Sequence, residues 1–215
     1  MAYRLIIFDL DGTLVDSRAD LSAAVNHALH AMGLPAVPLE TVSSYVGEGA
    51  RILMQRALGE HQDRIEQGLA LFMAYYRVHL LDHTRLYPGI AELLEALAAR
   101  PGTLAVLSNK PEAMTRAVLE GLGVLRYFAA VLGGDSLPAR KPDPAGIDHL
   151  RSLTATPRES VLVVGDSAID ARTAAAAGVA FCGVAWGLAP DSLRAAPVRH
   201  VITHPRELLA VVDGG

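Results

Sequence analysis

The stretch Leu5-Ile6-Ile7-Phe8-Asp9-Leu10-Asp11-Gly12-Thr13-Leu14-Val15-Asp16-Ser17 decides the fold of this chain. Four apolar residues run directly into Asp9, and a glycine follows three positions later. This pattern is typical of a buried parallel strand whose carboxyl end opens into a loop. Asp-x-Asp-Gly-Thr alone is also compatible with a surface turn, but the apolar run before it favours the buried strand.

Asp9 and Asp11 are expected to face one common space, because side chains two apart in an extended chain point to the same side. Two carboxylates this close repel each other unless a positive group lies between them. A hard divalent cation such as Mg²⁺ prefers oxygen ligands and bridges to phosphate oxygens. The stretch therefore predicts a cation site at the end of the strand.

The composition limits the classes of function. With 215 residues, of which 51% are hydrophobic, the chain can form one large domain or a domain with a small insert. The net charge of −4 gives no reason to expect a surface for nucleic acid or for an anionic membrane. Cys182 is the only cysteine, which excludes an internal disulfide or a thiolate cluster and suits a reducing compartment. Because the chain begins with a strand and has no membrane-spanning run, we expect a cytoplasmic protein.

The region that follows the first strand is predicted to be entirely helical. Apolar residues recur at helical spacing, and a Gly and a Pro end the first helix. We therefore expect an all-helical cap domain over residues 17–84, inserted between two parts of an α/β core domain at 1–16 and 85–215. The predicted helices of the insert cover 18–32, 38–45, 49–59 and 62–82.

From Tyr87 onward, predicted strands alternate with helices. Such alternation implies right-handed crossovers and an α/β fold, with a doubly wound parallel sheet covered on both faces. Ligands of these sheets bind beyond the carboxyl ends of the strands. The expected strands cover 104–107, 129–132, 161–164, 179–184 and 198–202, and the expected helices cover 88–99, 111–121, 144–153, 168–177 and a last segment from 205.

Polar residues gather at the ends of these strands. Ser108, Asn109 and Lys110 follow one strand, and Asp166 follows another. Asp166 and Asp170 are four apart across a helix start, so their carboxylates can face the same way. An ordinary helix cap also explains the Asp166 segment.

Lysine is rare in this chain, which uses arginine almost everywhere for positive charge. Lys110 and Lys141 are the only two lysines, and both fall in predicted loops at the strand ends. A solvated surface position is the usual role of a lysine. Here a compact ammonium that binds phosphate is the alternative, because the surface elsewhere carries arginine.

Together, the motifs resemble those of the haloacid dehalogenase superfamily of aspartate-nucleophile phosphatases, with a small helical cap after the first strand. The resemblance covers essentially the whole chain. The matching motifs are Asp9-Leu10-Asp11-Gly12-Thr13, Ser108-Asn109-Lys110, Lys141-Pro142 and Gly165-Asp166-Ser167 with Asp170.

The resemblance implies a covalent mechanism. Asp9 would attack phosphorus and form an aspartyl phosphate, and Asp11 would protonate the leaving alcohol and then take a proton from water. Mg²⁺ would be held by Asp9, Asp166 and the backbone carbonyl of Asp11, with help from Asp170 directly or through water.

The same resemblance implies the phosphate contacts. Ser108 and the backbone amides near Asn109 would bind the phosphoryl oxygens, and Lys141 would neutralise charge and orient Asp9. Thr13 would support the metal ligands or contact the phosphate.

The insert is expected to select the substrate. Residues 46–58 resemble the corresponding stretch of phosphoglycolate phosphatases. Gly47 and Gly49 let backbone amides approach a small ligand, and Arg51 can grip a carboxylate with two hydrogen bonds. A plain helix start with Arg51 in solvent is the alternative. Glu48 would repel an anionic substrate unless a cation compensates, or it would accept hydrogen bonds from a sugar.

Three functions follow from these residues. The first is a Mg²⁺-dependent phosphatase, monomer or homodimer, acting on a small phosphorylated metabolite and foremost on 2-phosphoglycolate. The second is a phosphosugar phosphatase or a mutase that resembles β-phosphoglucomutase and needs a second phosphate site, for which Arg51 is the available group. The third is a phosphate-binding protein without activity, which the complete carboxylate set argues against. Asp11 argues against a dehalogenase, and the lack of lysine before Lys110 excludes Schiff-base chemistry from the insert. Trp186 and Gly187 follow a strand end, and they border the site or pack beside it.

Overall fold

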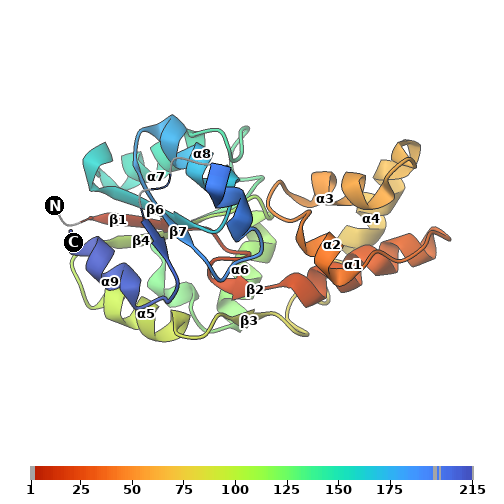
Figure 1. Ribbon diagram of the computed structural model, residues 1–215, viewed down its shortest axis with the longest axis horizontal. Helices are drawn as coiled ribbons and strands as arrows, with labels where there is room; N and C mark the ends of the chain where they lie inside the picture. Colours follow the sequence, from red (N-terminus) through yellow and green to blue (C-terminus); the bar gives the residue numbers. More distant parts are fainter. Residues whose placement is uncertain (1–2, 196–197, 199, 215) are drawn as a thin grey trace.

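Six parallel strands form the central sheet, in the order β5-β4-β1-β6-β7-β8. The strands are β1 (Leu5–Phe8), β4 (Thr103–Leu107), β5 (Ala130–Leu132), β6 (Val161–Gly165), β7 (Ala180–Val184) and β8 (His200–Ile202). This computed structural model describes residues 3–195, 198 and 200–214. The chain starts in the middle of the sheet, builds outward on one side and then returns to build the other (Figure 1). The direction therefore switches beside β1, where sheets of this kind bind ligands.

Helices cover both faces of the sheet, which explains the continuous apolar run of β1. Ile6 and Phe8 pack into one core with α5 and α6, whereas Leu5 and Ile7 pack into a second core with α7 and α8 on the opposite face (Figure 1). The α/β doubly wound prediction is confirmed. The core helices are α5 (Ile90–Ala98), α6 (Glu112–Gly121), α7 (Ala145–Thr154), α8 (Ala168–Ala177) and α9 (Glu207–Val212).

Four helices lie together beyond the carboxyl end of the sheet (Figure 1). They are α1 (Arg18–Ala31), α2 (Leu39–Ser43), α3 (Ala50–Leu58) and α4 (Ile65–Tyr76), here called the helical insert. Two short antiparallel strands, β2 (Val15–Asp16) and β3 (Arg85–Leu86), join the segments that lead into and out of the insert. The insert therefore sits over the edge of the sheet where β1 ends.

The buried carboxylate of Asp20 fastens these two segments together. It accepts hydrogen bonds from the backbone N–H of His83 at 2.9 Å and from the N–H and hydroxyl of Thr84 at 2.8 and 2.7 Å. These bonds hold the backbone of His83 and Thr84 directly before β3. The expected helix 62–82 is too long: Gln62–Arg64 form a 3-10 turn, α4 covers only Ile65–Tyr76, and turns and bends follow it.

The remaining elements differ little from expectation. The β2 and β3 pair was not predicted, since two-residue strands carry no periodicity. Of the expected strand 198–202, residue 199 lies outside the described part, and β8 begins at His200. None of the helices described is long and apolar enough to cross a bilayer. Short 3-10 turns cover Gln62–Arg64, Leu125–Tyr127, Arg158–Ser160 and Pro190–Ala195.

Candidate active site

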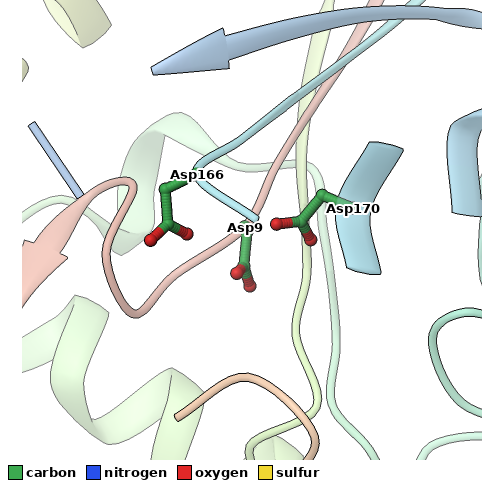
Figure 2. A group of neighbouring side chains, drawn as sticks. All are labelled: Asp9, Asp166 and Asp170. Atoms are coloured by element: carbon green, nitrogen blue, oxygen red, sulfur yellow. The ribbon is translucent and has the colours of Figure 1, made fainter. Parts of the chain in front are cut away.

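Three buried carboxylates converge at the carboxyl edge of the sheet (Figure 2). Asp9 directly follows β1, Asp166 directly follows β6, and Asp170 lies in the first turn of α8. Because β1 and β6 are neighbouring parallel strands, their ends meet at the same edge. One carboxylate oxygen from each of the three residues lies within 4.8 Å of the others. The predicted convergence of these residues is therefore observed.

The start of α8 fixes Asp170. Ser167 is the N-cap residue, and its hydroxyl donates to Oδ2 of Asp170 at 2.6 Å while its backbone N–H donates to the same oxygen at 3.2 Å. The Asp170 N–H donates in return to the Ser167 hydroxyl, which completes a capping box. The helix-cap interpretation is therefore confirmed, and the cap also directs the Asp170 carboxylate toward the other two.

Lys141 is the cation of this cluster. Its Nζ lies 2.9 Å from Oδ1 of Asp9 and 2.6 Å from Oδ1 of Asp170, and its side chain is only 4% exposed. The backbone N–H of Leu10 also donates to Oδ1 of Asp9, at 2.7 Å. Both donors fall on the same oxygen, which leaves Oδ2 of Asp9 without a hydrogen bond from the described residues.

One ammonium does not balance three carboxylates. Burial raises the pKa of Asp9 to about 8; Lys141 opposes this rise, and the charges of Asp170 and Asp166 add to it. Burial and Asp170 likewise raise the pKa of Asp166 to about 7. When all three carboxylates are ionised, the single ammonium leaves two negative charges uncompensated. A buried set of carboxylate oxygens with uncompensated negative charge suits a divalent metal, so Asp9, Asp166 and Asp170 could hold one.

The loop after β7 supports Asp166 through backbone hydrogen bonds. Oδ2 of Asp166 accepts hydrogen bonds from the backbone N–H of Leu188 at 2.7 Å and of Ala189 at 3.1 Å. A Cβ atom added at Gly187 would lie 2.2 Å from Cβ of Asp166, so only glycine fits this approach. The sequence analysis placed Trp186 and Gly187 of this loop at the border of the site or in packing beside it, but it did not predict that the backbone of the loop holds Asp166.

Thr13 and Trp186 lie behind the carboxylates. The Thr13 hydroxyl is 3.5 Å from Oδ1 of Asp166, and the Trp186 Nε1–H donates to the backbone oxygen of Thr13 at 3.1 Å. Neither side chain lines the cavity described below. In this geometry Thr13 supports a carboxylate of the cluster, and Trp186 packs behind the loop.

Asp11 lies beside the cluster and has its own cation. Oδ1 of Asp11 accepts hydrogen bonds from Nζ of Lys110 and from the hydroxyl of Ser17, both at 2.6 Å. Burial alone would lower the pKa of Lys110, but the neighbouring Asp11 carboxylate outweighs burial and raises it above its ordinary value. The rarity of lysine therefore pointed to a real site residue, and Lys110 was missing from the predicted catalytic and binding set.

A cavity that is partly open to solvent lies between the insert and the sheet edge, and its empty space, counted together with part of the open solvent, is about 510 Å³. Asp9 and Asp11 both line it, as expected from their spacing. Most of its wall is apolar, and among the described residues that line it Lys110 is the only basic one. The apolar wall consists of Leu21, Val46, Ala50, Leu53, Phe72, Met73, Pro111 and Met114.

Asn109 ties the insert to the core. Its Nδ2 donates to the backbone oxygen of Gly47 at 2.9 Å and to that of Lys141 at 3.0 Å, while its Oδ1 is buried without a hydrogen-bond partner among the described residues. Gly47 and Gly49 line the cavity with positive φ angles of 120° and 90°. Ser108 also lines the cavity, and its Oγ accepts the backbone N–H of Lys110 at 3.2 Å.

Arg51 and Glu48 do not lie where the sequence analysis expected them. The Arg51 guanidinium pairs with Glu66 of α4 at 2.8 Å, and Glu48 pairs with Arg56. None of these four side chains lines the cavity. The prediction that Arg51 faces a substrate is wrong for this structure, because a carboxylate on the neighbouring helix holds its side chain outside.

Comparisons with known proteins, by sequence and by structure, point to one family of hydrolases. The family model of the haloacid dehalogenase-like hydrolases matches residues 6–184. Phosphoglycolate phosphatase 1 of Pseudomonas aeruginosa is 42% identical over 192 residues, which cover 86% of this chain and 70% of the relative. Phosphoglycolate phosphatase of Vibrio parahaemolyticus is 40% identical over 194 residues, covering 86% and 84%. A crystal structure of a predicted phosphoglycolate phosphatase from Haemophilus somnus superposes with a TM-score of 0.91 at 34% identity, covering 97% of both chains.

Proposed function

The chain belongs to the haloacid dehalogenase-like hydrolases and is a phosphatase, and we propose that it uses Mg²⁺ and an aspartyl-phosphate intermediate to hydrolyse 2-phosphoglycolate. The observation that carries the proposal is the cavity in which Asp9 and Asp11 meet one basic side chain and an otherwise largely apolar wall. The names of the relatives support the same substrate.

Asp9 is the proposed nucleophile. Lys141 and the Leu10 N–H hold its Oδ1, so Oδ2 is free to attack phosphorus while the bond to the ester oxygen breaks. In the first step Asp11 has to be protonated, and it gives this proton to the departing oxygen and becomes a carboxylate. In the second step Asp11 takes a proton from water, which attacks the phosphorus of the aspartyl phosphate and releases Asp9. The Ser108 hydroxyl and the backbone amides near Asn109 bind the phosphoryl oxygens.

Asp9 and Asp166, with the backbone carbonyl of Asp11 and with Asp170, would hold Mg²⁺. When bound, the ion neutralises charge between the attacking carboxylate and the phosphoryl group. Lys141 favours the ionised form of Asp9 against the effect of burial and holds its Oδ1 in the same cluster.

The wall of the cavity favours a small leaving group over a sugar. A hexose would bury several hydroxyl groups against Leu53, Phe72 and Met114, where they would find no hydrogen-bond partner. A mutase needs a second phosphate site on the insert, yet no arginine of the described residues lines the cavity. We accordingly favour a phosphatase over a phosphosugar mutase, with residues 17–84 as the cap that closes over the substrate.

The experiment is phosphate release in Mg²⁺ across 2-phosphoglycolate, ethyl phosphate, hexose phosphates, nucleotides and pyrophosphate. We expect the highest kcat/KM for 2-phosphoglycolate and loss of turnover in Asp9→Asn. Asp63→Asn, an exposed aspartate of the insert, is the matched control and should behave as the wild type. A preference for hexose phosphates would overturn the substrate assignment, and full turnover in Asp9→Asn would overturn the mechanism.

A further inference from the structure

Tyr76, the last residue of α4, carries a buried hydroxyl group without a hydrogen-bond partner among the described residues. The side chain lines the cavity and is 1% exposed. Buried hydroxyl groups are nearly always paired, because an unpaired one loses its hydrogen bonds to water without compensation. An unpaired hydroxyl on a side chain that lines a cavity is therefore a group that a ligand bound there can pair.

The ammonium group of Lys110 lies beside the ring of Tyr76. Its Nζ is 5.1 Å from the ring centroid and 2.6 Å from Oδ1 of Asp11. An ammonium has three N–H donors, so the bond to Asp11 leaves capacity for a further acceptor. Lys110 belongs to the core and Tyr76 to the insert, and both side chains line the same cavity.

We propose that the Tyr76 hydroxyl and the Lys110 ammonium form the subsite that binds the carboxylate of the substrate. This inference rests on the proposed function and assigns the group that distinguishes 2-phosphoglycolate from other small phosphate esters. It also gives the carboxylate-binding role to residues other than Arg51, which is held by Glu66 outside the cavity.

The position of Asp11 fits this assignment. Asp11 is the proposed proton donor to the ester oxygen, and Lys110 touches Asp11 directly. In 2-phosphoglycolate a single CH₂ group separates the ester oxygen from the carboxylate. A cation in contact with the proton donor therefore lies on the side where that carboxylate must be, and the apolar wall at Phe72 and Met114 suits the CH₂ group.

Both groups are donors at neutral pH. Burial raises the pKa of Tyr76 to about 12, with Lys110 opposing the rise and Asp11 adding to it, so the phenol keeps its proton. The pKa of Lys110 lies above its ordinary value, so the ammonium keeps its charge. The buried Oδ1 of Asn109 also lacks a partner among the described residues, but it is an acceptor and does not bind a carboxylate.

The test compares 2-phosphoglycolate with ethyl phosphate, which has the same two carbons and no carboxylate. In Tyr76→Phe we expect the ratio of the two kcat/KM values to fall about tenfold or more, since hydrogen bonds to a charged group are strong. This fall in the ratio should come from a higher KM for 2-phosphoglycolate. Tyr75→Phe is the matched control: Tyr75 stacks between His27 and His79 outside the cavity, and its variant should keep the wild-type ratio.

A binding measurement separates this subsite from catalysis. In an Asp9→Asn background, Tyr76→Phe should weaken calorimetric binding of 2-phosphoglycolate about tenfold, and its melting temperature should match that of the parent. An unchanged ratio and an unchanged affinity would overturn the subsite while leaving the phosphatase intact. If the wild-type protein does not prefer 2-phosphoglycolate to ethyl phosphate, the proposed substrate fails as well as the subsite.

Discussion

The Nζ atom of Lys141 lies 2.9 Å from Oδ1 of Asp9, and this ion pair joins the loop before α7 to the end of the central strand. The same ammonium reaches Asp170. Lys141 therefore organises the cluster as well as balancing part of its charge, and its removal is expected to affect stability in a way that depends on pH.

We expect Lys141→Met to destabilise the metal-free protein by about 3–5 kcal/mol at pH 8.5, because it leaves buried carboxylates without their cation. At pH 5.5 the loss should be smaller, since the raised pKa values of Asp9 and Asp166 already favour their neutral forms there. Urea unfolding at both pH values measures this difference. The exposed neighbour Arg140→Met is the control and should change stability by less than about 0.5 kcal/mol.

The metal-free protein should lose stability as the pH rises. The pKa values of Asp9 and Asp166 are about 8 and about 7 in the folded chain, above the ordinary value of 3.8. Between pH 3.8 and these values the folded state therefore binds more protons than the unfolded state. The stability they contribute is complete below pH 3.8 and is lost as the pH passes 7 to 8. Mg²⁺ should therefore raise the melting temperature more at pH 8.5 than at pH 5.5. An equal rise at both pH values, measured against a chelator, would contradict this account.

Gly12 is expected to be essential to the site. A Cβ atom there would lie 2.3 Å from Oδ2 of Asp166, and φ is +87°. Gly12→Ala should lower kcat/KM by about 100-fold through displacement of Asp166. Gly33→Ala separates the effect of the close contact from that of the positive φ angle. Gly33 has a φ of +72°, but no atom lies within 4 Å of the added Cβ. That variant should lose about 1 kcal/mol of stability and keep its activity.

Asp20 is expected to stabilise the junction between insert and core. Asp20→Ala leaves two backbone N–H groups and the Thr84 hydroxyl without an acceptor, so we expect a loss of about 3 kcal/mol in the free energy of unfolding. Asp20→Asn retains one acceptor oxygen and should lose less. Asp63→Ala, an exposed position, should show little change in the same urea titration.

The sequence could predict what depends on local pattern. The apolar run into Asp9 and the alternation of strands and helices were enough for the sheet, and the resemblance to the family grouped Asp9, Asp166 and Asp170 as metal ligands. Parallel strands bring their carboxyl ends to one edge, so motifs far apart in the chain converge there.

Features that depend on partners from distant elements could not be predicted. Arg51 finds Glu66 on another helix, and Asp20 finds the backbone at Thr84 more than sixty residues later. No periodicity encodes such pairs. Lys110 was visible as one of only two lysines, but its role beside Asp11 and Tyr76 needed the packing of α4 against the sheet edge.

The central claim is that Asp9 carries the phosphoryl group during turnover. The most direct measurement is rapid acid quenching of the enzyme with 2-phosphoglycolate and Mg²⁺, followed by borohydride reduction and peptide mass spectrometry. Reduction of an aspartyl phosphate yields homoserine, and we predict homoserine at position 9 in the wild type and none in Asp9→Asn. Homoserine at another aspartate, or steady phosphate release with no modified residue in the peptide that contains Asp9, would contradict the account.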